Sequence, residues 1–280
     1  MIAIVVDSNS QLSPELAARL GVTVVPLVVR IDGTDFHEGV DLDADAFYGY
    51  WTPDGAPLVT TSQPSPGAFK DVYERLVAEG ATEILSVHTG SSLSGTLNSA
   101  GVAARAVPVP VRLVDTATAS FGVTCCAWAA VDAIADGAVL EEAARVAERR
   151  AEGLATAFIV GIPELIDRSG RVAGVDVGAA AAGGVPVIGG RGGDLVVLGT
   201  VRTVDESIVA MVDYALSHEP TSPAGLRVAV GTSDRSSFAV GAALTERLAR
   251  RGEVADVVQY RVGPSVGAYT GPGTAGLFVF

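Results

Sequence analysis

The stretch Ile2-Ala3-Ile4-Val5-Val6-Asp7 is a run of five apolar residues that ends at an acidic side chain. A continuous apolar run of this length predicts a strand covered on both faces, as strands of parallel sheets are. Ser13 and Pro14 then mark the start of a helix, and Gly21 marks its end. The same order of strand and helix recurs along the chain, so we predict an α/β fold with mainly parallel sheets.

A second series of strands and helices begins near residue 152, which divides the chain into a domain at 1–152 and a domain at 153–280. Residues 60–64 are predicted to be a loop, and the end of the chain, 262–280, is glycine-rich and then strongly apolar. The predicted strands span residues 2–6, 22–31, 83–88, 111–114, 155–160, 185–188, 195–201, 226–230 and 254–260.

The charge of the chain excludes one large class of partner. Among 280 residues there are 19 Lys and Arg against 32 Asp and Glu, which gives a net charge of −13. Nucleic-acid binding needs clustered cations that neutralise phosphates, so we expect no nucleic-acid partner. An anionic lipid surface would also repel the chain as a whole, although a local basic patch would leave a transient membrane contact open.

Motifs for metal, nucleotide or redox chemistry are missing from the sequence. The two cysteines, Cys125 and Cys126, are adjacent and read as small buried side chains, which suits a reducing cytoplasm. The chain has neither a phosphate-binding P-loop motif nor a GxSxG motif, and its three histidines lack metal-ligand spacing. We therefore expect no metal, no cofactor and no catalytic residues, in a protein without a signal peptide or membrane span.

Four segments that follow predicted strands carry short hydroxyl or amide side chains: 7–10, 61–63, 91–96 and 115–116. In open α/β sheets ligands bind outside the carboxyl ends of the strands. Hydroxyls and backbone N–H groups at a helix start suit an anion. Ordinary caps and turns give the same pattern, and for any single segment that interpretation is the simpler one.

The segment around 173–184 contains almost no side-chain bulk, with Ala173, Gly178, Ala180 and Gly183 among its small residues. Small residues here indicate either tight helix packing or the thin wall of a long apolar cavity. Composition alone does not choose between these two interpretations.

Several segments together resemble the DegV family. Val5-Val6-Asp7-Ser8 resembles the opening of its members, Thr61-Ser62-Gln63-Pro64-Ser65-Pro66 and Ser91-Ser92-Leu93-Ser94-Gly95-Thr96 resemble two of its loops, and Ser169-Gly170-Arg171 resembles its glycine-arginine turn. Gly267-Ala268-Tyr269-Thr270-Gly271-Pro272-Gly273 is similar to its C-terminal signature, with Tyr269 where the family usually has histidine. The matches follow the family's order over nearly the whole chain.

The resemblance implies a two-domain α/β protein that binds one fatty acid. Its carboxylate would sit near the interdomain cleft and its tail in the C-terminal domain. The implied carboxylate ligands are Thr61, Ser62, Ser94, Gly95, Tyr269 and Thr270, and the candidates for lining the acyl tunnel are Ala173, Gly178, Ala180 and Gly183.

In that family the carrier is not an enzyme. It presents the fatty acid to a separate bacterial fatty acid kinase, which phosphorylates the carboxylate, and the product enters phospholipid synthesis. The resemblance therefore implies a long-chain fatty acid as ligand and the kinase as partner, with Arg171 and Arg202 as candidates for docking it. The alternative is an enzyme or ligand-sensing module for a small carboxylated or phosphorylated metabolite in the same cleft.

Overall fold

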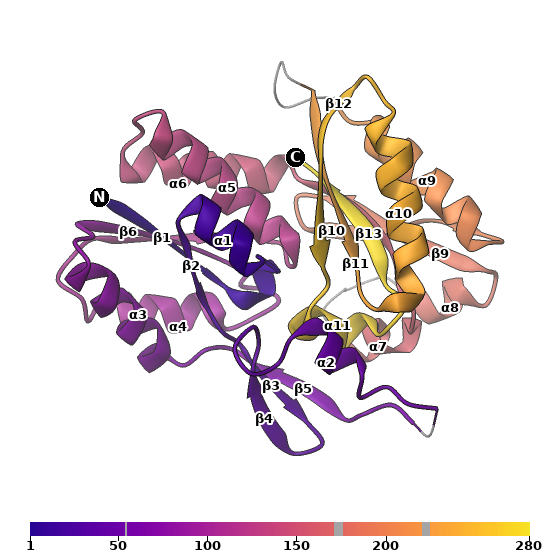
Figure 1. Cartoon of the computed structure of the whole chain (residues 1–280), viewed down its shortest axis with the longest axis horizontal. Coiled ribbons are helices and arrows are strands. Elements are labelled where there is room, and N and C mark those ends of the chain that lie inside the picture. The colour runs from indigo at the N-terminus through magenta and orange to yellow at the C-terminus, as the bar shows by residue number, and fades with distance from the viewer. Residues whose placement is uncertain (54, 171–175, 220–224) are drawn as a thin grey trace. The chain divides into compact units, whose positions relative to one another are not determined.

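The computed structural model describes residues 1–53, 55–170, 176–219 and 225–280 (Figure 1). The chain divides into two compact units. Met1–Leu42 and Leu58–Glu152 form the first, and Asp43–Pro57 and Gly153–Phe280 form the second. The second unit thus includes Asp43–Pro57, a segment that the sequence-based division assigns to the first domain.

The main sheet of the first unit is entirely parallel, with the strand order β2-β1-β6-β7. Helices cover both faces of this sheet, and residues of the central strand alternate between them. Val5 of β1 packs with Phe69 and Tyr73 of α3, whereas Val6 packs with Val123 of α5. The elements are β1 (Ile2–Asp7), α1 (Pro14–Leu20), β2 (Val22–Val25), α3 (Pro66–Ala78), β6 (Glu83–His88), α4 (Thr96–Ala104), β7 (Val111–Asp115), α5 (Phe121–Ala135) and α6 (Leu140–Gly153).

The helix starts of this unit follow the sequence signals. The Ser13 hydroxyl accepts a hydrogen bond from the N–H of Leu16 at 3.2 Å and so caps α1. The Ser65 hydroxyl accepts one from the N–H of Ala68 at 3.1 Å and caps α3. Each cap satisfies a backbone donor that has no partner within its own helix.

A small three-stranded antiparallel sheet corrects two predictions. The single strand expected over 22–31 is two strands, β2 and β3 (Val28–Ile31), because Pro26 lies between them and the chain changes sheet there. The loop expected over 60–64 begins as strand β5 (Val59–Ser62), which pairs with β3. The other neighbour of β3 is β4 (Thr34–His37).

The sheet of the second unit has six strands in the order β10-β9-β8-β13-β11-β12. Among the described residues of this unit, β11 and β12 run parallel and the other four pairings are antiparallel, so the α/β class is confirmed but a mainly parallel sheet is wrong for this unit. The strands are β8 (Ala155–Ile159), β9 (Val185–Arg191), β10 (Asp194–Val201), β11 (Leu226–Thr232), β12 (Val254–Arg261) and β13 (Ala275–Val279).

Two pairs of helices cover opposite faces of this sheet. Helices α9 (Val204–Leu216) and α10 (Phe238–Ala249) pack on the face to which Val187 belongs. Helices α7 (Pro163–Ser169) and α8 (Val177–Ala181) pack on the face of the adjacent residue, Ile188. Successive residues of a strand point to opposite faces, so these are separate cores.

The segment Asp43–Pro57 packs in the second unit against α11 (Pro264–Thr270). Helix α2 (Ala44–Tyr48) packs against α11, and the Tyr48 hydroxyl donates a hydrogen bond to the carbonyl oxygen of Val262 at 3.0 Å. The Arg261 guanidinium also lies 2.8 Å from the Asp45 carboxylate. Across the described ranges, no helix combines the length and apolarity that a membrane crossing requires.

Candidate functional site

The carboxyl ends of β1 and β6 meet at a fully buried carboxyl group. Oδ2 of Asp7 accepts hydrogen bonds from Nδ1 of His88 at 3.0 Å and from the N–H of Thr89 at 3.1 Å. Oδ1 accepts from the Thr89 hydroxyl at 2.9 Å and from the N–H of Asn9 at 3.1 Å. Both oxygens are therefore satisfied inside the protein, which makes Asp7 a structural anchor rather than an exposed base.

His88 continues this network to the other side. Its Nε2 lies 2.6 Å from the Ser86 hydroxyl, which lies 2.7 Å from the hydroxyl of Tyr73. One set of proton positions satisfies every hydrogen bond in this series: Tyr73 donates to Ser86, Ser86 donates to Nε2 of His88, and Nδ1 of His88 donates to Asp7. Burial raises the pKa of Tyr73 to about 12, although the Ser86 bond opposes the rise, so the phenol keeps its proton.

The same network fixes the neighbouring loops. The side-chain oxygen of Asn9 accepts a bond from the N–H of Ser120 at 2.9 Å. Asp115 accepts one from the N–H of Ser91 at 3.1 Å, so β7 holds the loop that follows β6. Ser120 has a φ of 59°, which costs energy in a residue with a side chain. The backbone at this edge is thus set by tertiary hydrogen bonds.

Ser94 lies in the loop that this network positions. Its N–H bonds to the carbonyl oxygen of Gly90 at 3.1 Å. Its hydroxyl lies 2.8 Å from the hydroxyl of Thr96 and accepts a weaker bond from the Thr96 N–H at 3.3 Å. The half-buried Ser94 hydroxyl therefore sits beside the first residue of α4, where partial positive charge suits an anionic group.

The structure brings the loop of Ser94 close to the segment that follows β5. A Cβ built on Gly95 would lie 3.0 Å from Nε2 of Gln63, so the glycine leaves room for that amide. Thr61 is half-buried and Ser62 is exposed, and both are on strand β5 instead of in a loop. Gln63, which the sequence analysis did not select, is the residue that joins the two segments.

The remaining predicted carboxylate ligands belong to α11 of the second unit. Tyr269 is half-buried and Thr270 is buried. The Thr270 hydroxyl donates to the carbonyl oxygen of Val266 at 3.3 Å, and the Thr270 carbonyl accepts from the N–H of Ile162 at 3.2 Å. The end of α11 is consequently tied to the segment between β8 and α7.

Asp234 anchors the turn that follows α11. Its carboxylate accepts hydrogen bonds from the N–H of Gly273 at 2.7 Å, from the Ser236 hydroxyl at 2.8 Å and from the Ser233 hydroxyl at 3.1 Å. Burial alone would raise the pKa of Asp234, but these bonds outweigh burial and hold the pKa below its usual value. Nothing in the sequence pattern around Asp234 indicated this partner for the C-terminal signature.

The small-residue segment has a packing reason at one position. The carboxylate of Asp167 accepts the N–H of Gly178 at 2.7 Å, and a Cβ on Gly178 would lie 2.7 Å from the same oxygen. Ala180 is half-buried near the end of α8. Gly183 is exposed, and a Cβ built on it would make ordinary contacts of 3.7 Å with the Ala180 carbonyl oxygen and the Thr200 methyl group. Ala173 lies outside the described residues.

Of the two arginines predicted to dock a partner, Arg202 is described and Arg171 lies outside the described residues. The Arg202 side chain is 88% exposed and pairs with Glu206 at 3.4 Å, which leaves most of the guanidinium in solvent. A search of the described residues finds no group of His, Cys, Asp and Glu arranged to hold a metal ion.

The fold and loops define an α/β protein of two compact units, with a hydroxyl-bearing loop held at the carboxyl edge of a parallel sheet. The chain belongs to the DegV family, described as uncharacterised proteins, whose model matches residues 1–280. A DegV domain-containing protein of Streptomyces coelicolor is 34% identical over 281 residues, which cover 99% of this chain and 98% of the relative.

Solved structures of similar proteins share the whole fold. A DegV family protein from Thermus thermophilus, described by its fatty acid binding, has a TM-score of 0.86 at 30% identity, covering 100% of this chain and 99% of that one. A stearic acid-binding protein from Eubacterium ventriosum has a TM-score of 0.84 at 25% identity, covering 100% and 98%. These two relatives bind fatty acids on the same architecture.

Proposed function

We propose that this chain is a fatty-acid-binding carrier that presents its bound acid to a separate fatty acid kinase. The kinase would phosphorylate the carboxylate, and the acyl phosphate would feed phospholipid synthesis in a bacterial cytoplasm. The observation that carries the proposal is the full-length similarity, at 30% identity, to a fatty-acid-binding DegV protein. The carrier would contribute no catalytic residue of its own and would need no cofactor.

The proposed carboxylate ligands are Thr61, Ser62, Ser94 and Gly95 in the first unit and Tyr269 and Thr270 in the second. The hydroxyl of Ser94 beside the start of α4 supports this role, because a helix start favours an anion. The buried network below the loop supports it too, since a fixed loop loses little freedom when a ligand binds.

The acyl tail and the carboxylate head group contribute differently to the binding free energy. A sixteen-carbon acid has about 14 methylenes, and burying them at about 0.8 kcal/mol each contributes about 11 kcal/mol before the costs of ordering and association. Each hydroxyl bond to the carboxylate contributes about 1.5–3 kcal/mol, offset in large part by desolvation. The tail should set the affinity, and the hydroxyls should set where the carboxylate lies.

The acyl tail is proposed to lie along the segment that contains Ala173, Gly178, Ala180 and Gly183, and Arg171 and Arg202 are proposed to meet the kinase. The exposure of Arg202 supports docking, because an arginine in solvent is available to a partner's carboxylates. When the kinase binds, the ion pair between Arg202 and Glu206 would have to break or be shared with a carboxylate of the kinase.

Native mass spectrometry of freshly purified protein, followed by lipid analysis, tests the binding step. A fatty acid that co-purifies at one per chain is expected, and a protein that neither carries nor takes up fatty acid would contradict the proposal. A kinase assay with ATP and the loaded carrier then tests presentation. Binding without phosphorylation would instead favour a lipid-sensing protein, and metabolite turnover by the chain alone would favour an enzyme.

A further inference from the structure

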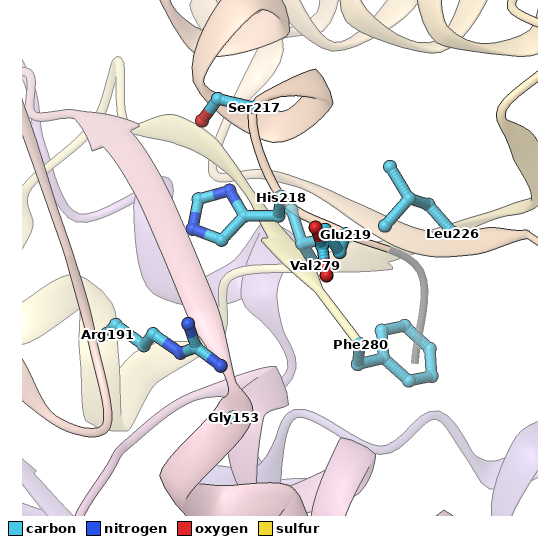
Figure 2. Close-up of a pocket in the computed structure, with 8 residues that line it drawn as sticks. All are labelled: Gly153, Arg191, Ser217, His218, Glu219, Leu226, Val279 and Phe280. Atoms are coloured by element: carbon cyan, nitrogen blue, oxygen red, sulfur yellow. The ribbon is translucent and has the colours of Figure 1, made fainter. Parts of the chain in front are cut away.

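A cavity of about 320 Å³ opens at one end of the six-stranded sheet, in the second unit (Figure 2). Its volume falls at the lower end of the range for small-molecule sites. It lies on the α9 face, because Leu226 and Val279 on its floor belong to the core beneath α9. Helix α8, which carries Gly178 and Ala180 of the proposed acyl-tail segment, packs on the opposite face through Val177, so this cavity is a different one.

The cavity has an apolar floor and a polar rim. Leu226, Val279 and the ring of Phe280 supply the apolar part. Arg191 at the end of β9 and His218 just after α9 line the polar part, and Figure 2 shows both side chains to the left of Leu226 and Phe280. A lining of this kind suits a short apolar molecule with one polar end.

The two polar side chains on the rim differ in what they offer a ligand. Nδ1 of His218 donates a hydrogen bond to the carbonyl oxygen of Tyr214 at 2.8 Å, and the two rings pack edge to face, which fixes the imidazole as a wall of the cavity. Among the described residues Arg191 has no ion-pair partner. Its positive charge is nevertheless felt at Tyr214, where it opposes the rise in pKa that burial causes.

The charges on the rim favour an anion on the Arg191 side. Glu219 also lines the cavity, but Figure 2 shows it between His218 and Leu226, away from the Arg191 guanidinium. Glu219 is exposed, so water screens its repulsion. A guanidinium without a partner is the group best suited to bind a carboxylate with two hydrogen bonds.

We propose that this cavity is a second ligand site, which binds a small carboxylate with a short apolar body. The carboxylate meets the Arg191 guanidinium, and the apolar body covers Leu226 and Val279. The site does not depend on the fatty-acid-carrier function, since no residue that lines it belongs to the proposed carrier site.

Methyl NMR tests the site through reporters that lie inside it. The chain is labelled at Leu and Val methyl groups, saturated with stearate so that a long-chain site is filled, and titrated with hexanoate, 1-hexanol and hexylammonium in turn. The Leu226 and Val279 methyl signals are expected to shift saturably with hexanoate and far less with the other two. No saturable shift, or an equal one with 1-hexanol or hexylammonium, would overturn the proposal.

Variants then test the rim. Arg191→Gln is expected to weaken hexanoate binding about tenfold or more, because it removes the charged donor. His218→Gln should weaken it less, because the ring N–H of His218 already bonds to Tyr214. Arg250→Gln is the matched control, an exposed arginine just after α10 that does not line the cavity, and should bind as wild type. Unchanged hexanoate binding by Arg191→Gln would overturn the proposed carboxylate site, whether or not the chain also carries a long-chain fatty acid.

Discussion

Oδ2 of Asp7 and Nδ1 of His88 lie 3.0 Å apart, and this buried pair joins the ends of the two central strands of the parallel sheet. Neither side chain is exposed to solvent. Because Asp7 also holds both the N–H and the hydroxyl of Thr89, the pair fixes the first residue of the loop that carries Ser94. The proposed head-group contact therefore rests on a hydrogen-bond network and not on loop sequence alone.

Replacing the Asp7 carboxyl group should destabilise the first unit. In Asp7→Asn one acceptor oxygen becomes a donor that faces other donors, so we expect the free energy of unfolding to fall by about 1–3 kcal/mol. Urea denaturation followed by circular dichroism measures the change. Asp71→Asn on the exposed surface of α3 is the control and should unfold as wild type does. Equal stability of Asp7→Asn and wild type would mean that the network contributes little.

Ser94→Ala should separate fatty acid binding from phosphorylation. The tail dominates the affinity, so binding should weaken by less than about tenfold. Phosphorylation by the kinase should fall by roughly a hundredfold, since a misplaced reacting group costs rate more than affinity. Lipid titration and an acyl phosphate assay give the two numbers. Ser92→Ala, an exposed serine of the same loop, is the control, and a wild-type rate in Ser94→Ala would remove Ser94 from the site.

Asp234 should make the stability of the second unit depend on pH. Its pKa is lowered in the folded protein, so its stabilising effect is full above the unfolded value of about 3.9 and is lost as the pH falls through the folded value. Asp234→Asn should therefore melt below wild type at neutral pH, and the two curves should converge in acid. Thermal unfolding at several pH values tests this. A difference that stays constant down to acid pH would exclude the carboxylate charge as its cause.

Local sequence signals predicted much of the fold correctly. The cap Ser13 starts a helix as expected, because a cap depends only on residues a few positions away. Long-range pairing was harder to predict. The antiparallel order of β8, β9 and β13 depends on which strands meet in space, and the apolar runs of these strands look the same in either direction.

The candidate site was predicted by resemblance more than by pattern. The hydroxyl side chains of residues 91–96 were recognised in the sequence, but the hydrogen bonds that hold their loop in place were not. His88 was interpreted as a satisfied structural histidine, which its bonds to Ser86 and Asp7 confirm, but Asp7 could not be predicted as its partner because the two residues are distant in sequence. Helix α11 and strand β13 were missed within 262–280, where glycine hides helical periodicity and a buried central strand shows no alternation.

Added bulk on α8 and just after it should shorten the longest fatty acid that the chain accepts. In Ala180→Leu and Gly183→Leu the new side chain would fill space proposed for the acyl tail. Gly183 has room for a Cβ, so that variant should fold normally. Competition binding with acids of increasing length measures the limit. Ala179→Leu, at an exposed position of the same helix, is the control. An unchanged length limit in folded variants would show that these residues serve packing alone.

Tyr269→Phe should impair handling of the carboxylate without unfolding the second unit. Tyr269 stands where the family usually has histidine, and it is half-buried on α11. A phenol donates a neutral hydrogen bond, whereas histidine can carry a positive charge near neutral pH. Neutral donation to an anion is the weaker of the two, so we expect a loss of no more than about tenfold in the phosphorylation rate. The hydroxyls of Thr61 and Ser94 should carry correspondingly more of the contact.

The experiment compares Tyr269→Phe with Tyr269→His under the same conditions. The phenylalanine variant keeps the ring and removes only the hydroxyl, so the melting temperature should stay close to wild type while the rate of acyl phosphate formation falls. The histidine variant should restore that rate, and the restoration should be larger at pH 6 than at pH 8, because a protonated imidazole is the stronger donor. Tyr50→Phe, an exposed tyrosine, is the control. A wild-type rate in Tyr269→Phe would mean that the Tyr269 hydroxyl has another partner and that the carboxylate is held elsewhere.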